Sequence, residues 1–192
     1  GRVTKKGLDQ PVGNAAINHV PRQMIADGLK AAAADAGYKG GFSVIITVPR
    51  GEQVGARTFN PQLGIYGGIS ILGTSGIVEP MSDRAIVDTA KVELNVLKEE
   101  GVHDLLLTIG NYGEKYARES LGLDLSKRVK CSNFIGDTIS AAVSLGFESV
   151  MLIGHIGKMV KLAAGITNTH SAFADARMDI MAACAVKAGG SI

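Results

Sequence analysis

The sequence contains no tryptophan, and aromatic residues make up only 5% of its 192 residues. Its two cysteines, Cys131 and Cys184, lack CxxC spacing, which argues against a disulfide framework or a zinc site. No apolar run approaches the roughly 18 residues of a membrane span, and no signal peptide is visible. These absences predict a cytoplasmic protein with an aliphatic core, no bound metal and no membrane contact.

Neither sign of charge dominates, since charged residues make up 20% of the chain and the net charge is +2. Lys and Arg are balanced by Asp and Glu along most of the chain, so we expect no nucleic-acid partner. Glycine is the residue in excess, with 25 copies, whereas an average protein has about 7% glycine. The glycines lie at the ends of apolar runs, which favours ligand-binding loops over a flexible linker.

The second part of the chain alternates strand-like and helix-forming runs. We expect strands at 104–109, 128–131 and 149–153, and helices at 82–100, 114–121, 133–145, 156–164 and 173–188. Ser82 is a good N-cap for the first of these helices, and one face of that helix carries Ile86, Ala90, Leu94 and Leu97. The last helix is expected to bury a stripe of Phe173, Ala176, Ile180 and Cys184. The alternation predicts an α/β fold in which residues 76–192 form a Rossmann-like domain, a parallel sheet with flanking helices.

Residues 1–75 are expected to form part of an α+β N-terminal domain. The pattern predicts a loop over 1–18 that could include a short strand, a helix from about 21 to 36, a strand at 42–48, helical turns within 52–59 and a short strand at 69–72. The apolar, β-branched run at 42–48 is the clearest strand in the sequence. The glycine-rich stretch 64–80 is either a tight connection between domains or a ligand loop that uses the hydroxyls of Thr74 and Ser75.

Three polar clusters each follow a predicted strand, at 110–114, 131–133 and 154–158. In a parallel sheet, ligands bind outside the carboxyl ends of the strands, and a glycine turn before a helix offers free N–H groups. Any one cluster could be ordinary turn chemistry, and for Asn133 alone an N-cap is the favoured interpretation. The coincidence of three clusters at one edge is what predicts a binding site.

Several side chains in these clusters have two interpretations. His155 could hydrogen-bond a ligand or act as a base, and His170 could join the site or only cap a helix. Lys158 lies near a helix start, where a cation is unfavourable and an anionic ligand would offset it. Cys131 is better explained as a packed thiol. Glu79 could be a base or simply a helix-end carboxylate. The sequence has no catalytic-triad order, HExxH motif, P-loop or metal-ligand spacing.

Several long runs carry a strong resemblance, at 59–65, 67–74, 76–82, 110–114, 130–134, 154–158 and 168–171. In these runs, and in their order, the chain resembles the cobalt-precorrin-5B C1-methyltransferase family, CbiD-like proteins of cobalamin biosynthesis. The resemblance implies transfer of a methyl group from S-adenosyl-L-methionine to C1 of cobalt-precorrin-5B, which gives cobalt-precorrin-6A in the anaerobic pathway. It also implies a corrinoid substrate that carries many carboxylates, for which Arg22, Arg50, Arg57 and Lys158 are candidate partners.

The Gly110–Gly113 turn is not the acidic-x-Gly-x-Gly loop of the commonest methyltransferases, so we place the site at the strand ends on physical grounds. The expected catalytic residues are His155, Asn111 and Glu79. The expected cofactor-binding residues are Gly110, Asn111, Tyr112, Gly113, Ser132, Asn133, Gly154, His155 and Gly157. The expected corrinoid-binding residues are Thr74, Ser75, Lys158, Asn168, Thr169 and His170.

The family resemblance also implies further sequence on both sides, including an N-terminal Thr-Gly-Thr-Cys-type stretch, so this chain looks like the middle of a longer protein. Two alternatives therefore stay open. The chain could be a non-catalytic fragment, or it could be another nucleotide-binding α/β module, although it lacks a Rossmann fingerprint. Whether it forms a homo-oligomer is also open.

Overall fold

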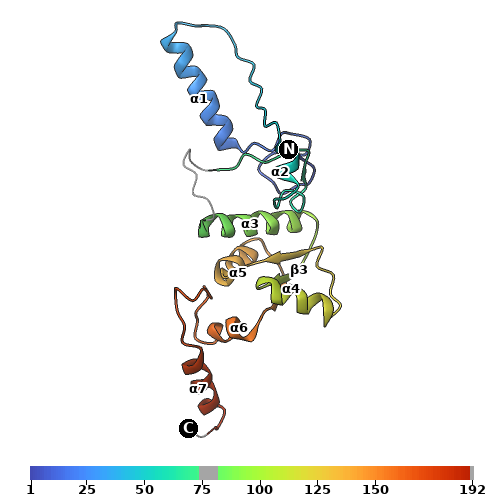
Figure 1. Cartoon of the computed structure of the whole chain (residues 1–192), viewed down its shortest axis with the longest axis vertical. Coiled ribbons are helices and arrows are strands. Elements are labelled where there is room, and N and C mark those ends of the chain that lie inside the picture. The colour runs from blue at the N-terminus through green and yellow to red at the C-terminus, as the bar shows by residue number, and fades with distance from the viewer. Residues whose placement is uncertain (74–81, 191–192) are drawn as a thin grey trace. The chain divides into compact units, whose positions relative to one another are not determined.

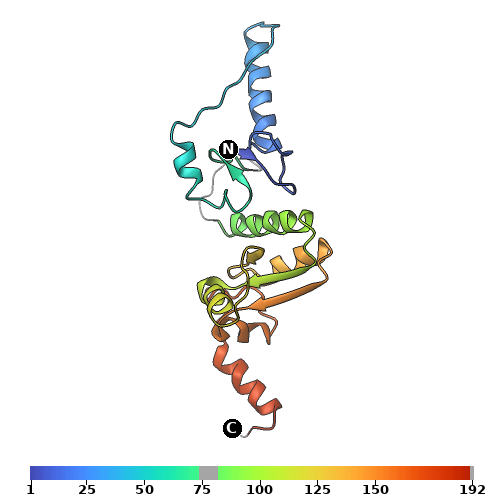
Figure 2. The same ribbon diagram turned by 90° about the vertical axis from the view of Figure 1, so that its right-hand side faces the viewer.

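The computed structural model describes residues 1–73 and 82–190 (Figure 1; Figure 2). The chain divides into two compact units, the N-terminal unit of residues 1–80 and the C-terminal unit of residues 81–192. The boundary that we predict at 75/76 lies outside the described residues, as do Thr74, Ser75 and Glu79. In the part of the chain that is described, no helix is long and apolar enough to cross a membrane.

The N-terminal unit is built from short elements. They are β1 (Arg2–Val3), α1 (His19–Asp35), α2 (Gly51–Gly55) and β2 (Ile65–Tyr66). The strands β1 and β2 pair in antiparallel orientation. Both helices agree with the predicted helical regions. The strand predicted at 69–72 is reduced to an isolated bridge between Ile71 and Ile17.

The strand predicted at 42–48 is wrong, because residues 41–48 form neither a helix nor a strand. The side chains of this run face water, and Ile45 is 87% exposed. Strand propensity mainly reflects how side chains pack on a pleated sheet, and a strand needs a neighbour to complete its hydrogen bonds. No described segment of the N-terminal unit pairs with this run.

The C-terminal unit is an α/β layer, as the sequence predicts. Its elements are α3 (Asp83–Glu99), β3 (Asp104–Thr108), α4 (Gly110–Glu119), β4 (Arg128–Lys130), α5 (Ile135–Ser144), β5 (Ser149–Ile153), α6 (Ile156–Leu162) and α7 (Arg177–Lys187). The three strands are parallel in the order β4-β3-β5. Right-handed crossovers in opposite directions from β3 to β4 and from β4 to β5 place α4 and α5 on opposite faces.

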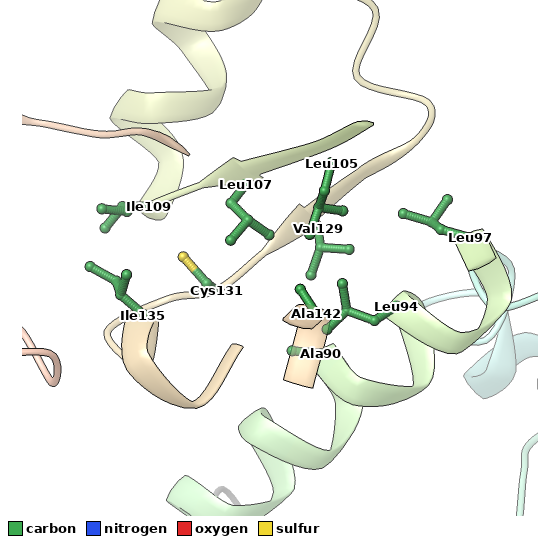
Figure 3. Packing of buried hydrophobic residues seen from close by; sticks show 10 residues of the cluster. All are labelled: Ala90, Leu94, Leu97, Leu105, Leu107, Ile109, Val129, Cys131, Ile135 and Ala142. Carbon is green, nitrogen blue, oxygen red and sulfur yellow. The ribbon is translucent and has the colours of Figure 1, made fainter. Parts of the chain in front are cut away.

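The hydrophobic core fills the space between one face of this sheet and the helices α3 and α5 (Figure 3). It consists of Ala90, Leu94, Leu97, Leu105, Leu107, Ile109, Val129, Cys131, Ile135 and Ala142. Helix α3 begins as predicted, because the Ser82 hydroxyl accepts a hydrogen bond from the N–H of Ala85 at 3.2 Å. Three of its four predicted core residues are buried, whereas Ile86 is 38% exposed.

In the C-terminal unit three helix starts differ from prediction, and two of them affect the site. Helix α4 begins at Gly110 rather than at 114, and α5 has Phe134, not Asn133, as its N-cap. Helix α7 begins at Arg177 rather than at 173. The predicted buried stripe on the last helix is therefore wrong, since Ile180 is buried but Phe173 and Cys184 are exposed.

Candidate functional site

The strand order creates a switch point at the carboxyl edge of the sheet. From the central strand β3 the chain moves through α4 to β4 on one side, and from β4 it returns through α5 to β5 on the other. In such sheets the crevice outside the two central strand ends is the usual ligand site. Thr108, the last residue of β3, pairs with both Lys130 and Ile153. The three predicted polar clusters therefore do meet at one edge.

Glycines allow α4 to start directly against the end of β5. Gly110 has a φ of 65°, which turns the chain sharply from β3 into α4. A Cβ on Gly113 would lie 2.6 Å from the carbonyl oxygen of Ile153, and one on Gly154 would lie 2.7 Å from Ile109. Only hydrogen fits at these positions. The N–H groups of the first turn of α4 have no partner within the helix and carry its partial positive charge.

Asn133 connects three segments of the site, which is more than the N-cap role favoured by sequence. Its Oδ1 accepts hydrogen bonds from Lys158 Nζ at 2.8 Å and from the Thr169 hydroxyl at 3.3 Å. Its backbone oxygen accepts one from the N–H of Thr169 at 2.9 Å. Asn168 lies beside this link, because it forms a bridge with Phe134. The predicted residues from 133, 158 and 168–169 are thus brought together.

Lys158 reaches across the edge from the first turn of α6. Its ammonium bonds to Asn133 after β4, and it lies 4.0 Å from the position that a Cβ on Gly110 would occupy after β3. The Lys158 side chain therefore links the segments after β4 and β5 and lies near the one after β3.

A second lysine, Lys130 of β4, holds Asn111 in the first turn of α4. Its Nζ donates to Asn111 Oδ1 at 2.6 Å and lies 3.4 Å from Glu114 Oε2. Glu114 also lies 2.7 Å from Nε of Arg128, as an ion pair without the alignment of a hydrogen bond. We did not predict Lys130 or Arg128. The available signal is their spacing around the buried Val129, which turns both side chains away from the core and towards α4.

Glu93 of α3 completes the charges around β4. Burial raises the pKa of its carboxyl above the usual value, and the positive charge of Arg128 offsets part of that rise. Because burial disfavours the charged form, Glu93 loses its proton less readily than a surface glutamate does.

His155 is the N-cap of α6 and is presented as a hydrogen-bond donor. Its Nδ1 accepts a hydrogen bond from the N–H of Gly157 at 3.1 Å. A ring nitrogen that accepts carries no proton, so in the neutral ring Nε2 carries the proton and can donate. The exposed ring of Tyr112 lies 5.9 Å from the imidazole, centroid to centroid. Of the two predicted roles, this geometry favours binding a ligand over acting as a base.

His170 makes only local contacts in the described structure. Its N–H donates to Asn168 Oδ1 at 3.1 Å, and its Nδ1 accepts from the N–H of Ala172 at 3.2 Å. The loop that holds it is anchored by Lys161, which is 2% exposed and donates to the carbonyl oxygens of Thr169 and Ala174. Lys161 was not predicted, because a buried lysine has no sequence signal that separates it from a surface one.

The end of β4 combines a buried thiol with a strained serine. Cys131 is 1% exposed, its Sγ donates to the Thr108 carbonyl at 3.4 Å, and burial raises the pKa of the thiol to about 11. This agrees with the predicted packed thiol. Ser132 has a φ of 52°, and it is the only non-glycine residue with a positive φ among residues 1–73 and 82–190. Such backbone strain often accompanies binding sites.

A cavity of about 490 Å³ lies between α6 and α7, next to this edge. It is lined by Ile156, Gly157, Val160, Asp175, Arg177, Met178, Asp179 and Met181. Gly157 also bonds to His155, so the cavity adjoins the strand-end cluster. Within the described residues, no group of three His, Cys, Asp or Glu side chains could hold a metal ion.

Comparison with known proteins identifies the family. Residues 1–80 match the family model CbiD, and the whole chain is 54% identical over 191 residues to a protein of Ruminiclostridium cellulolyticum named cobalt-precorrin-5B C(1)-methyltransferase. Along its whole length the chain is similar to proteins of the CbiD family. This confirms the resemblance seen in the sequence.

Other proteins of the same name extend the match. The Clostridioides difficile protein is 46% identical over 95% of this chain, and the Thermoanaerobacter protein is 50% identical over 95%. These three CbiD relatives are covered over 50%, 46% and 49% of their lengths, so the chain spans about half of each. A crystal structure titled cobalamin biosynthesis protein (cbiD) from Archaeoglobus fulgidus is 28% identical and covers 88% of this chain and 53% of that chain, with a TM-score of 0.34.

Proposed function

We propose that this chain contributes the cofactor-binding layer of an enzyme that methylates C1 of cobalt-precorrin-5B to give cobalt-precorrin-6A, with S-adenosyl-L-methionine as methyl donor. The observation that carries the proposal is the carboxyl edge of the sheet, where the three polar clusters meet and α4 starts against the end of β5 with only glycine at the contact. The names of the relatives that match the whole chain support methylation of C1 of cobalt-precorrin-5B. Both cysteines are free thiols, which suits a reaction in the reducing cytoplasm.

The residues at this edge fit a nucleoside ligand with a charged tail. Gly110 leaves open space at the start of α4, where backbone N–H groups are free, and Asn111, Asn133 and His155 add side-chain donors. We assign the cofactor to these residues together with Tyr112, Ser132 and Gly157. When bound, S-adenosyl-L-methionine supplies an electrophilic methyl group on a sulfonium centre.

In this reaction the main task of the protein is to align the methyl group of the donor with C1 of the substrate. The bond from C1 to the methyl carbon forms as the bond from sulfur to that carbon breaks, and sulfur keeps the electron pair. Such an in-line displacement gains most from holding the two reactants in register. Asn111 and His155 suit that task as donors that position the ligand. Glu79, which lies outside the described residues, stays a prediction.

Among the proposed corrinoid-binding residues, the fold separates those that hold the site in place from those that can contact the substrate. Thr169 is 3% exposed and bonded to Asn133, so we assign it to holding the site rather than touching the substrate. On the same loop His170 is exposed and Asn168 is half-buried, and both keep the proposed substrate role. Arg22 donates to the carbonyl oxygens of Ala15 and Ile17, which leaves it a weaker candidate for the corrinoid carboxylates.

The test is calorimetric titration of the chain with S-adenosylhomocysteine, the product that cannot react. We expect binding in the micromolar range for the chain and for the Ruminiclostridium relative. Gly113→Ala should abolish binding, because the new methyl would displace α4 from Ile153. Gly28→Ala is the matched control, since nothing lies within 4 Å of its Cβ position in the exposed helix α1.

A folded chain that does not bind the product, beside a relative that does, would contradict the proposal for this chain and favour a non-catalytic fragment. Thermal shifts with NAD or ATP test the remaining alternative of another nucleotide-binding module. A ligand at one hundred times its dissociation constant stabilises the folded state by roughly 2.7 kcal/mol. A shift with NAD or ATP but not with S-adenosylhomocysteine would therefore support that alternative.

A further inference from the structure

Two lysine–asparagine pairs lie at the strand ends, and in both the lysine donates a hydrogen bond to the asparagine side-chain oxygen. Lys158 Nζ donates to Asn133 Oδ1 at 2.8 Å, and Lys130 Nζ donates to Asn111 Oδ1 at 2.6 Å. An asparagine side chain has one acceptor oxygen and one NH₂ group. Because each oxygen is turned towards a lysine, the NH₂ group is what each asparagine can offer to a ligand.

The neighbouring groups are donors as well. The first turn of α4 presents backbone N–H groups, and His155 presents Nε2–H because its Nδ1 is occupied by Gly157. The nearby carboxylate of Glu114 is turned to Lys130 and Arg128 and is only 18% exposed. A sheet edge lined by donors favours a ligand group that only accepts hydrogen bonds.

The charge of Lys158 supports the same conclusion. Its ammonium lies near the start of α4, whose N-terminus carries partial positive charge. Lys130 has Glu114 as a counter-charge. Among residues 1–73 and 82–190, Lys158 has no carboxylate within salt-bridge distance. A cation in this place would be stabilised by an anion that arrives with the ligand.

We propose that Lys158, the Asn133 NH₂ group and the first turn of α4 bind a carboxylate, and that this is the carboxylate at the amino-acid end of the methyl donor. The inference rests on the proposed function, because it uses the same crevice. Lys130 acts as a positioning residue that turns the NH₂ group of Asn111 towards the ligand. The cofactor would thereby be held by its charged end, with the nucleoside towards His155 and Gly157.

The experiment compares S-adenosylhomocysteine with its decarboxylated analogue, which lacks only the carboxylate. The chain should bind the complete product at least about tenfold more tightly, as expected for a hydrogen-bonded charge pair. Lys158→Met should remove about that factor for the product and leave the affinity for the analogue unchanged. Lys115→Met is the matched control, since Lys115 is an exposed lysine of α4 that faces Glu119 at 3.9 Å. Far-UV circular dichroism of each variant checks that it is folded.

Equal affinities for the two ligands, or an equal loss of both in Lys158→Met, would overturn the inference while leaving the cofactor site in place. The preference of the intact chain for the product should also weaken as salt is added, because screening acts on the charged pair. A preference that does not change between low and high salt would count against a carboxylate contact.

A second arm separates this inference from the proposed function. Acetate and its neutral counterpart acetamide are titrated while the amide NMR signals of Gly110, Asn111 and Asn133 are followed. Shifts with acetate alone support an anion site even if the product does not bind, and in that case the methyl-donor assignment fails. Competition by cobyrinic acid, but not by its methyl ester, would then assign the carboxylate to the macrocycle. No response to acetate, beside clear binding of the product, overturns the inference and keeps the proposed function.

Discussion

The two units of this chain differ in how their apolar residues are used. In the C-terminal unit, ten buried residues from two strands and two helices form one cluster. In the N-terminal unit, helix α1 has no buried residue, and the apolar run 41–48 lies exposed. The comparison teaches that an apolar pattern yields a strand only where a partner strand is within reach, which β3 has on both sides and the 41–48 run lacks.

The same contrast explains where the candidate site lies. A binding site needs side chains held by packing and by second contacts, and the C-terminal unit provides both. Asn133, Lys158 and Thr169 are joined by hydrogen bonds at the edge of a packed sheet. Four predictions test the comparison between the units.

The largest effect is expected in the core of the C-terminal unit. Leu107 of β3 is fully buried, and its side chain lies in the core between the sheet and the helices α3 and α5. Leu107→Ala should destabilise this unit by about 2–5 kcal/mol, because it leaves a cavity that the packing cannot fill. Urea unfolding measures the change. Val143→Ala, at a position of α5 that is 68% exposed, should stay within about 0.5 kcal/mol of the parent. Similar losses in the two variants would show that the core is placed incorrectly.

A smaller loss is expected at the start of α1 in the N-terminal unit. Asp9 accepts a hydrogen bond from the N–H of His19 at 2.8 Å, whereas the side chain of Asn18, the N-cap, does not cap the helix. Asp9→Ala should lower stability by about 0.5–1.5 kcal/mol at neutral pH, because that N-terminal N–H loses its partner.

The pH dependence of this contact has a definite sign. Partial burial raises the pKa of Asp9, but hydrogen bonds from Gln10 and His19 outweigh it and leave the pKa below the usual value. A lowered pKa stabilises the folded state above the unfolded-state pKa, and this contribution is lost as the pH falls through the folded-state pKa. The difference between Asp9→Ala and the parent should therefore shrink in acid. A difference that grows in acid would contradict the assignment.

The third prediction concerns how the stability of the C-terminal unit changes with pH, rather than the size of a loss at one pH. Burial raises the pKa of Glu93, so the folded state binds its proton more tightly than the unfolded state does. Stability should then fall as the pH rises from the unfolded-state pKa to the folded-state pKa of Glu93. Glu93→Gln should remove that slope in unfolding curves recorded across this range. Glu99→Gln, at an exposed position of the same helix, should retain it.

The smallest effect is expected in the exposed run of the N-terminal unit. Ile45→Ser should change the free energy of unfolding by no more than about 0.5 kcal/mol, because Ile45 is already in water. Thermal unfolding measures it. A loss of the size expected for Leu107→Ala would mean that this run is covered in solution, and it would remove the contrast between the units.

Sequence patterns predicted the C-terminal unit well because its signals are local. The cap at Ser82, the periodic face of α3 and the three strands each depend on neighbouring residues. The start of α4 was placed four residues late because Gly110 and Gly113 are typical of turns. Here Gly110 turns the chain into the helix, and Gly113 serves the close contact with β5 from within the helix. That contact belongs to the tertiary structure and leaves no local pattern.

The sequence predicted where the candidate site lies but not the hydrogen bonds that connect its residues. Strand order brings the three clusters to one edge, which alternation of strands and helices already implies. The hydrogen bond between Lys158 and Asn133 joins residues 25 apart in the sequence, and no hydrophobic periodicity predicts such a contact. The same holds for Lys130, whose partner Asn111 lies on another element. Thr74, Ser75 and Glu79 stay predictions, since they lie outside the described residues.

The left-handed backbone of Ser132 has a consequence for selection. A non-glycine residue in this region costs roughly 1 kcal/mol that glycine would not. Laboratory evolution of this chain for heat resistance alone should therefore favour Ser132→Gly among its early changes. If the hydroxyl of Ser132 serves the ligand, selection for cobalamin-dependent growth should restore the serine. The frequency of glycine at this one codon would then report which of the two pressures a population has experienced.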